Sequence, residues 1–133
     1  MDCIFCKIIK GEIPSYKIYE DDMTYAFLDI ACDSYGHTLV IPKKHCENVL
    51  DCDDEYLNAN MASVKKIAKH YVEECGFDGV NILNASGESA QQTVFHLHFH
   101  IVPRKKDDGM DMWALKEKYE LDLDDICDKL KLN

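Results

Sequence analysis

The feature that most constrains this chain is a row of three histidines in its last third, His96, His98 and His100, which alternate with apolar residues. In an extended strand successive side chains point to opposite faces, so the histidines share one face and the apolar residues between them share the other. An isolated histidine is most often an ordinary core or surface residue. Three at strict period two are different, because imidazole is costly to bury without a partner and strands rarely favour it. The row therefore predicts a strand with one chemically active face and one face packed on a core.

The length of the chain, 133 residues, is that of one ordinary domain, which can bury a core without disulfide cross-links. The hydrophobic fraction of 47% and the charged fraction of 30% are typical of a soluble globular protein. No apolar run approaches the roughly 18 residues that a membrane span requires. Lys7 and Lys10 interrupt the first apolar stretch, so we expect neither a secretory signal nor a membrane partner.

The net charge and the cysteine content limit the possible binding partners and the cellular compartment. The net charge of −10 argues against binding to long nucleic acids, whose affinity rests on neutralising many phosphates. A small nucleotide is not excluded, because a few local donors can hold its phosphate. The seven cysteines are an odd number without regular spacing, which favours reduced thiols and a cytoplasmic location over a disulfide framework.

Hydrophobic periodicity predicts a sheet and one long helix. The helix is expected over 53–75, where apolar residues recur at helical spacing and Gly76 supplies a C-terminal cap. Short apolar segments occur before Gly11 and over 124–131. Besides the histidine strand, four further strands are expected where β-branched and aromatic residues run between turn signals: 17–20, 24–30, 36–42 and 80–84.

Cys3 and Cys6 form a C-x-x-C whose chemistry the local sequence leaves open. Redox use favours a preceding strand and a following long helix, whereas metal use requires two further ligands elsewhere. No strand is expected before this motif and there is no second C-x-x-C, so any zinc must be completed by histidines. The alternative is that both cysteines are small buried residues.

The histidine row also admits two interpretations. Either one zinc is held by all three histidines, or one histidine is a nucleophile while its neighbours bind, shuttle protons or ligate a metal elsewhere. The C-x-x-C favours the second, because it offers metal ligands of its own. The small and polar residues over 85–93 form a loop that can supply donors to a phosphate, although a plain connector has the same composition.

The run from His96 to Val102 resembles the H-φ-H-φ-H-φ-φ signature of the histidine triad (HIT) family, in which φ is an apolar residue. The resemblance covers a core of about 4–104 within a single domain over 1–133, and leaves 105–133 as a variable C-terminal tail. Further segments stand in the order of the Hint-like branch, whose members carry an N-terminal zinc-binding C-x-x-C: Phe27–Ile30, Gly36–His45, Asn84 and Gln92–Phe95.

The resemblance implies an α+β fold, with a five-stranded antiparallel sheet, one long helix and short terminal helices. It also implies a homodimer in which the two sheets join edge to edge. The implied chemistry is hydrolysis or transfer of a nucleoside monophosphate group through a nucleotidyl-histidine intermediate on His98. Neutral imidazole is a good nucleophile near neutral pH, and a covalent intermediate splits one displacement into two easier steps.

We therefore expect a purine nucleoside phosphoramidase that acts on phosphoramidate or phosphoanhydride conjugates of AMP or GMP, and adenosine 5'-monophosphoramidase is the favoured activity. One alternative is a dinucleoside polyphosphate hydrolase, since the same triad cleaves a phosphoanhydride. Another is a non-catalytic, zinc-stabilised nucleotide-binding scaffold dimer. The intact pair of His98 and His100 weighs against the scaffold, which needs no nucleophile.

The resemblance also assigns roles to individual residues. His100 and His37 bind the phosphate and assist proton transfer beside His98, and Asp29 takes the ribose hydroxyls. One structural zinc (Zn) per chain is held by Cys3, Cys6, His45 and His96. The remaining nucleotide-binding residues are phosphate donors or line the base pocket: Asn84, Gln92 and Thr93 for the phosphate, and Ile4, Phe5, Ile8, Phe27 and Ile30 for the base. The chain departs from many relatives at Gln91, where they have glycine beside the phosphate.

Overall fold

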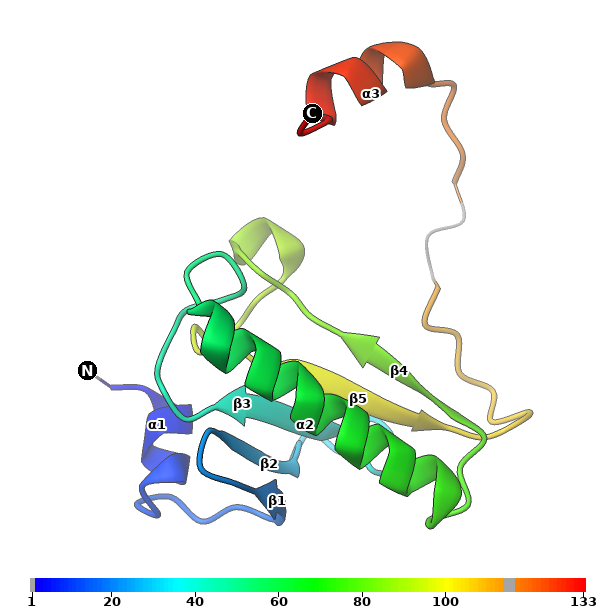
Figure 1. The fold of residues 1–133 in the computed structure, drawn as a ribbon. Coiled ribbons are helices and arrows are strands. Elements are labelled where there is room, and N and C mark those ends of the chain that lie inside the picture. Colours follow the sequence, from blue (N-terminus) through cyan, green and yellow to red (C-terminus); the bar gives the residue numbers. More distant parts are fainter. Residues whose placement is uncertain (1, 114–116) are drawn as a thin grey trace.

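The fold is built on one five-stranded sheet in the order β1-β2-β3-β5-β4, in which every neighbouring pair is antiparallel (Figure 1). The structure is a computed structural model that describes residues 2–113 and 117–133. The strands and helices have these bounds: β1 Lys17–Glu20, β2 Thr24–Leu28, β3 Thr38–Pro42, β4 Gly79–Leu83, β5 Phe99–Arg104, α1 Ile4–Ile9, α2 Asp54–Glu73, the 3₁₀ turn η1 Glu88–Ala90 and α3 Leu123–Leu130. The predicted α+β fold with its antiparallel sheet, long helix and short terminal helices is confirmed.

One strand ends earlier than its apolar pattern suggests. The strand expected over 24–30 stops at Leu28, because Asp29 Oδ1 accepts a hydrogen bond from the backbone N–H of Ala31 at 2.8 Å. This side-chain turn competes with the strand ladder, as aspartate commonly does. The chain therefore leaves the sheet at the residue that the resemblance assigns to ribose.

The long helix α2 covers one face of the sheet (Figure 1). Its buried residues recur at helical spacing, and Val64 and Ile67 pack against the sheet residues Val40 and Ile101. The other face carries α1, whose Phe5 belongs to a second apolar cluster. The sheet is thus the middle layer between two helices, and its two faces have different apolar clusters.

The histidine run is not one continuous strand. β5 begins only at Phe99, and the N–H of Leu97 donates to the carbonyl of Cys46 at 2.9 Å instead of to a strand neighbour. The alternation of faces is kept nevertheless. Leu97 lies in the cluster beneath α2, whereas the rings of His96 and His98 lie against Phe5 on the side of α1. The run bends away from the sheet because the loop around Cys46, not a strand, provides its hydrogen-bond partner.

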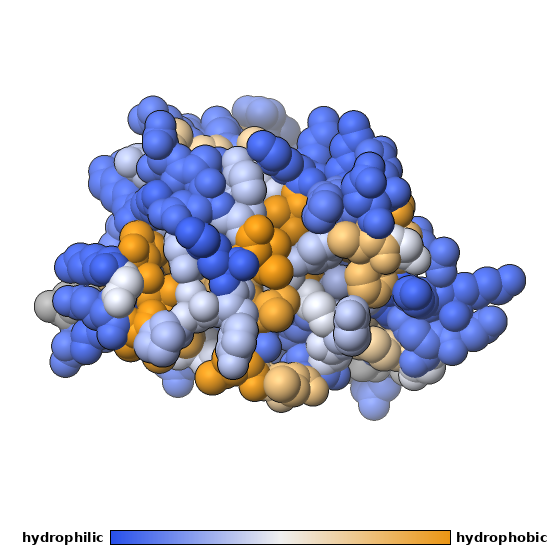
Figure 2. All heavy atoms as spheres, turned by 90° about the horizontal axis from the view of Figure 1, so that it is seen from below, coloured by the Kyte–Doolittle hydropathy of each residue, from blue (hydrophilic) through white to orange (hydrophobic). Residues whose placement is uncertain are grey.

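Residues 105–113, which follow β5, lead away from the body of the molecule, and α3 stands clear of the sheet (Figure 1). No residue of α3 is buried. Figure 2 shows hydrophilic residues along the upper border and both sides of the face seen from below, with apolar atoms exposed between them. Within 2–113 and 117–133, no helix combines the length and apolar character needed to cross a bilayer.

Truncation of Ile101, which is fully buried between β3, β4 and α2, is expected to destabilise the fold. Ile101→Ala leaves a cavity in the cluster beneath α2, and the free energy of unfolding should fall by about 2–5 kcal/mol. The same substitution at Ile30, which is 79% exposed, is the matched control and should change it by less than about 0.5 kcal/mol. Urea denaturation measures both, and equal effects would contradict the assigned core.

Candidate functional site

Two of the predicted catalytic histidines meet across a strand pair. β3 and β5 pair with Leu39 opposite His100, so His37, two residues earlier in the chain, lies at the end of the pair. The Nε2 atom of His37 lies 2.8 Å from Nδ1 of His100. The ring centroids of His98 and His100 lie 5.0 Å apart. The structure therefore brings the three predicted catalytic histidines, His37, His98 and His100, into one group.

The ring of His98 is held by a backbone carbonyl. Its Nδ1 lies 2.8 Å from the carbonyl oxygen of His96, and since a carbonyl can only accept, Nδ1 carries the proton. The neutral ring then has its lone pair on Nε2, for which the described residues provide no partner. The side-chain amide of Asn84 donates to the carbonyl oxygen of His98 at 3.1 Å. Both contacts fix the segment that carries Nε2 of His98.

Burial favours the uncharged forms of His98 and His100. Desolvation lowers the pKa of His98, and a backbone hydrogen bond from the ring to His96 only partly opposes it. Desolvation together with the charges of His98 and His37 lowers the pKa of His100 to about 4. A neutral imidazole has a free lone pair, so this electrostatic environment favours nucleophilic attack on phosphorus.

His37 is in contact with two carboxylates. Its Nδ1 lies 2.7 Å from Oδ1 of Asp33, at hydrogen-bond distance, and 3.7 Å from Oδ2 of Asp29. Asp29, His37 and His100 place potential ligand atoms within 4.8 Å of one another, which is compatible with a metal ion. Both nitrogens of His37 are already hydrogen-bonded, so the hydrogen-bonded arrangement accounts for this group without a metal.

The loop before the histidines is ordered by Gln92. The amide of this buried side chain donates to the carbonyls of Glu47 at 2.6 Å and Val94 at 3.0 Å, and its oxygen accepts from the N–H of Gly87 at 2.8 Å. A phosphate contact from the Gln92 side chain would require exchange of one of these bonds. The side chain of Thr93 is exposed.

Gln91 has a left-handed backbone, with φ 72° and ψ 28°. This conformation favours glycine and is strained for a residue with a side chain. It explains why glycine suits this position in relatives, as the resemblance implies. The turn is closed here by the N–H of Gln91, which donates to the carbonyl of Glu88 at 2.9 Å.

The residues expected around the base fall into two groups. Phe5, Ile8 and Phe27 are buried in one apolar cluster, and the rings of Phe5 and Phe27 meet edge to face with centroids 5.4 Å apart. Ile4 and Ile30 are exposed, at 49% and 79%. The structure thus gives the predicted pocket a buried floor and two exposed apolar side chains.

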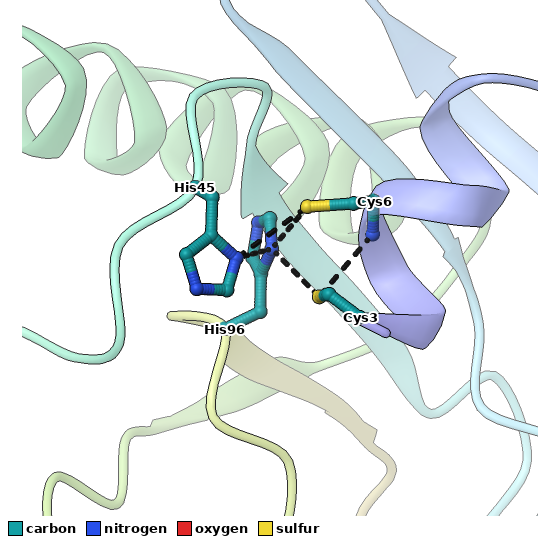
Figure 3. Close-up of side chains that lie close together, drawn as sticks. All are labelled: Cys3, Cys6, His45 and His96. Carbon is teal, nitrogen blue, oxygen red and sulfur yellow. Dashed lines mark hydrogen bonds between the residues drawn. The ribbon is translucent and has the colours of Figure 1, made fainter. Parts of the chain in front are cut away.

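The four predicted metal ligands, Cys3, Cys6, His45 and His96, converge from three separate parts of the chain (Figure 3). Their ligand atoms all lie within 4.8 Å of one another, so these residues can hold a metal ion. Cys3 and Cys6 come from the start of α1, where Cys3 Sγ accepts from the N–H of Cys6 at 3.4 Å. His45 follows β3, and His96 precedes β5.

The chemistry of this group suits a cation. His96 is fully buried, and its Nε2 donates to the carbonyl of Pro42 at 2.9 Å, which leaves the lone pair on Nδ1 facing the sulfur atoms. Desolvation lowers the pKa of His96 to about 4. Desolvation and the neighbouring Cys3 raise the pKa of the Cys6 thiol to about 11. A bound cation reverses this penalty, because it stabilises a thiolate.

The sequence did not predict two groups of the site, the side chain of Asp33 and the carbonyl of Pro42. Asp33 stands four residues before His37, but inside a loop such spacing does not predict contact. The carbonyl of Pro42, which fixes the tautomer of His96, leaves no signal in the side-chain pattern. For Asp33, the sequence offered only its polar character and its position near His37.

A sequence model described as HIT domain matches residues 10–107, a range that includes the three catalytic candidates but begins after Cys3 and Cys6. Protein hit from Bacillus subtilis is 53% identical over 109 residues, which are 81% of this chain and 75% of that protein. Adenosine 5'-monophosphoramidase HNT1 from Saccharomyces cerevisiae is 46% identical over 103 residues, 77% of this chain and 63% of that protein.

A solved structure from Mycobacterium smegmatis, described as a Zn-bound histidine triad family protein, is also similar to this chain. The two superpose with a TM-score of 0.78 at 40% sequence identity. The superposition covers 84% of this chain and 81% of that chain. Sequence and fold comparisons therefore agree on one family.

In His100→Gln, the free energy of unfolding is expected to fall less below neutral pH than it does in the wild type. The pKa of His100 falls from its ordinary 6.5 to about 4 in the folded state, so the unfolded chain binds the proton first as the pH falls. The stabilisation that neutral His100 contributes is fully present above about pH 6.5 and is lost as the pH falls towards about 4. Between pH 7 and pH 5 this residue should account for about 1–2 kcal/mol of the fall in unfolding free energy.

Urea denaturation of the wild type and His100→Gln at both pH values measures this difference. His70→Gln, a substitution at an exposed histidine of α2, controls for the exchange itself. The assignment is wrong if the wild type and His100→Gln lose stability equally between the two pH values.

Proposed function

This chain belongs to the HIT domain family, and we propose from that premise that it is a nucleotide hydrolase that cleaves nucleoside 5'-phosphoramidates at the α-phosphorus. The observation that carries the proposal is the orientation of His98, whose Nδ1–H is held by the carbonyl of His96. The free Nε2 lone pair is then the nucleophile. Adenosine 5'-monophosphoramidase is the favoured activity, in agreement with the name of the yeast relative.

The proposed reaction has two displacements. In the first, Nε2 of His98 bonds to phosphorus while the bond from phosphorus to the leaving amine breaks, and the amine takes up one proton. In the second, water attacks phosphorus, the electron pair of the P–N bond returns to His98, and the water gives up one proton. The two proton transfers balance, so the products are the nucleoside monophosphate and the free amine.

Neighbouring groups provide binding and proton transfer in this proposal. His37 and His100 lie beside His98 and pass the protons. Asp29 lies at the end of β2 and takes the ribose hydroxyls, while the cluster of Phe5, Ile8 and Phe27 contacts a purine of AMP or GMP. Asn84, Gln92 and Thr93 complete the phosphate site. Donors fixed around the phosphate stabilise charge that develops on its oxygens.

We also propose that the four-ligand cluster binds one structural zinc. A tetrahedral zinc ion with Zn–S of about 2.3 Å and Zn–N of about 2.0–2.1 Å separates sulfur from nitrogen by about 3.5 Å and two nitrogens by about 3.4 Å. The corresponding distances here are similar: 3.4 Å for Cys3 to His96, 3.4 Å for Cys6 to His45, 3.5 Å for Cys6 to His96 and 3.1 Å for His45 to His96. Zinc bound here would hold the ligands together without an open position for substrate.

The proposal extends to assembly and location. β1 and β4 are the two edges of the sheet, and an unpaired edge can join the same edge of a second copy. This supports the expected homodimer with joined sheets. All seven cysteines are free thiols, which supports a cytoplasmic location.

Incubation with an adenosine 5'-phosphoramidate should produce a covalent adenylyl adduct on His98. The adduct is detected by mass spectrometry after a rapid acid quench, and peptide mapping assigns its position. His98→Ala should lose the adduct and at least about 10³-fold in turnover, because removal of a nucleophile removes the covalent route. His70→Ala, which alters a histidine outside the site, should keep the wild-type rate.

A diadenosine polyphosphate in a parallel incubation separates the two enzyme hypotheses. Faster turnover of the phosphoramidate supports the proposed activity, and faster turnover of the polyphosphate favours the alternative. Absence of adduct and turnover with both, indistinguishable from His98→Ala, would overturn both and leave the scaffold hypothesis.

Cys6→Ser should abolish stoichiometric zinc binding. Serine is a weak zinc ligand, so the purified variant should contain much less than the one zinc per chain expected for the wild type. Cys127→Ser, at an exposed cysteine of α3, is the matched control and should keep the full content. Elemental analysis by mass spectrometry measures both, and unchanged zinc in Cys6→Ser would refute the ligand set.

A further inference from the structure

Three side chains form a continuous hydrogen-bonded chain from solvent into the histidine group. Asp33 Oδ1 lies 2.7 Å from Nδ1 of His37, and Nε2 of His37 lies 2.8 Å from Nδ1 of His100. The side chain of Asp33 is 60% exposed, whereas that of His37 is only 10% exposed. The chain of contacts thus starts at the surface and ends beside His98.

The chemistry of the carboxylate fixes where the protons lie. The hydrogen bond from His37 lowers the pKa of Asp33, so its carboxylate is ionised at neutral pH and can only accept. Nδ1 of His37 must then carry a proton, and in the neutral ring its Nε2 has the lone pair. That lone pair accepts from Nδ1–H of His100. The free nitrogen of His100 is therefore Nε2.

The backbone of the loop holds Asp33 in place. The N–H of Asp29 donates to the carbonyl of His37 at 2.9 Å, which closes the loop at its two ends. Gly36 adopts φ 79°, and a Cβ there would lie 3.1 Å from Cγ of Pro103 on β5. The loop is thus packed against the strand that carries His100.

The neighbouring carboxylate cannot replace Asp33. Oδ2 of Asp29 lies 3.7 Å from Nδ1 of His37, too far for a hydrogen bond, and its Oδ1 accepts from the N–H of Ala31. Asp29 therefore contributes charge but does not select a tautomer of His37.

We propose that Asp33 is a positioning residue for the reaction: it fixes the Nδ1-protonated tautomer of His37 and thereby directs the free Nε2 of His100 towards the transferred phosphate group. This inference rests on the proposed hydrolase function. Asp33 touches no substrate and acts through His37. When Nε2 of His100 takes the proton of the attacking water, the imidazolium that forms is balanced by the carboxylate through His37.

The pH dependence follows from the groups that face His100. These are His98 on the same run, His37 and Asp33 from the loop before β3, and Asp29 at the end of β2. The two carboxylates favour the protonated form of His100, and the two histidines oppose it. Removal of the Asp33 charge should therefore shift the protonation of His100 to lower pH.

The direct test is Asp33→Asn in the full chain, with ¹⁵N NMR of the histidine side chains at neutral pH. In the wild type, His37 should be a single tautomer protonated at Nδ1. In Asp33→Asn, whose amide can donate as well as accept, the Nε2-protonated form of His37 should appear. Asp22→Asn makes the same charge change at an exposed site at the other end of β2 and should leave the His37 signal unchanged.

The second readout is kinetic, with an adenosine 5'-phosphoramidate as substrate. Asp33→Asn should lower kcat by about 10-fold to 100-fold with little change in KM, and the acidic limb of the pH profile should move to lower pH. Asp33→Glu restores the carboxylate and should recover part of kcat. A thermal melt of each variant checks that the fold is retained.

The outcomes separate this inference from the function on which it rests. An unchanged His37 tautomer in Asp33→Asn, or a changed tautomer with wild-type kcat and pH profile, would overturn the role of Asp33. No turnover by the wild type would count against the proposed hydrolase, and the tautomer measurement would still decide whether Asp33 controls His37.

Discussion

The hydrogen bonds of His96 connect the two halves of the site. Its Nε2 is bound to the carbonyl of Pro42 at the end of β3, and its Nδ1 faces Cys3 and Cys6. Its own carbonyl accepts the Nδ1 proton of His98. One buried residue therefore joins the N-terminal helix to the sheet and also determines which nitrogen of the neighbouring histidine is free. A metal in this cluster would act on His98, two residues away, only by fixing its position.

The same principle of fixed tautomers applies to the other histidines. A backbone carbonyl orients His98, and the carboxylate of Asp33 orients His37 and, through it, His100. Each ring thus has at least one nitrogen hydrogen-bonded to a backbone carbonyl, a carboxylate or a neighbouring ring. Burial also favours the neutral forms of His98 and His100, so these two rings carry lone pairs instead of positive charge.

One face of the histidine run packs in the core, and the other face carries the histidines of the site. Leu97, Phe99 and Ile101 lie beneath α2 in the core, and this packing sets the position of the run. His96 and His98 face the opposite cluster with Phe5. A shift by one residue would exchange the two faces, which would bury imidazoles under α2 and lose both core and site. The packing of the apolar residues therefore specifies the register of the histidines.

The sequence by itself determined the element types, the alternation of faces and the identity of the histidine triad, because these depend on periodicity and on a short local motif. It could not determine that β5 starts only at Phe99, since the partner of Leu97 is a loop carbonyl 51 residues away in the chain. The tautomers of His96 and His98 and the contact of Asp33 with His37 likewise needed the tertiary structure. Backbone carbonyls are the same at every position of a sequence, and only folding decides which side chain each one meets.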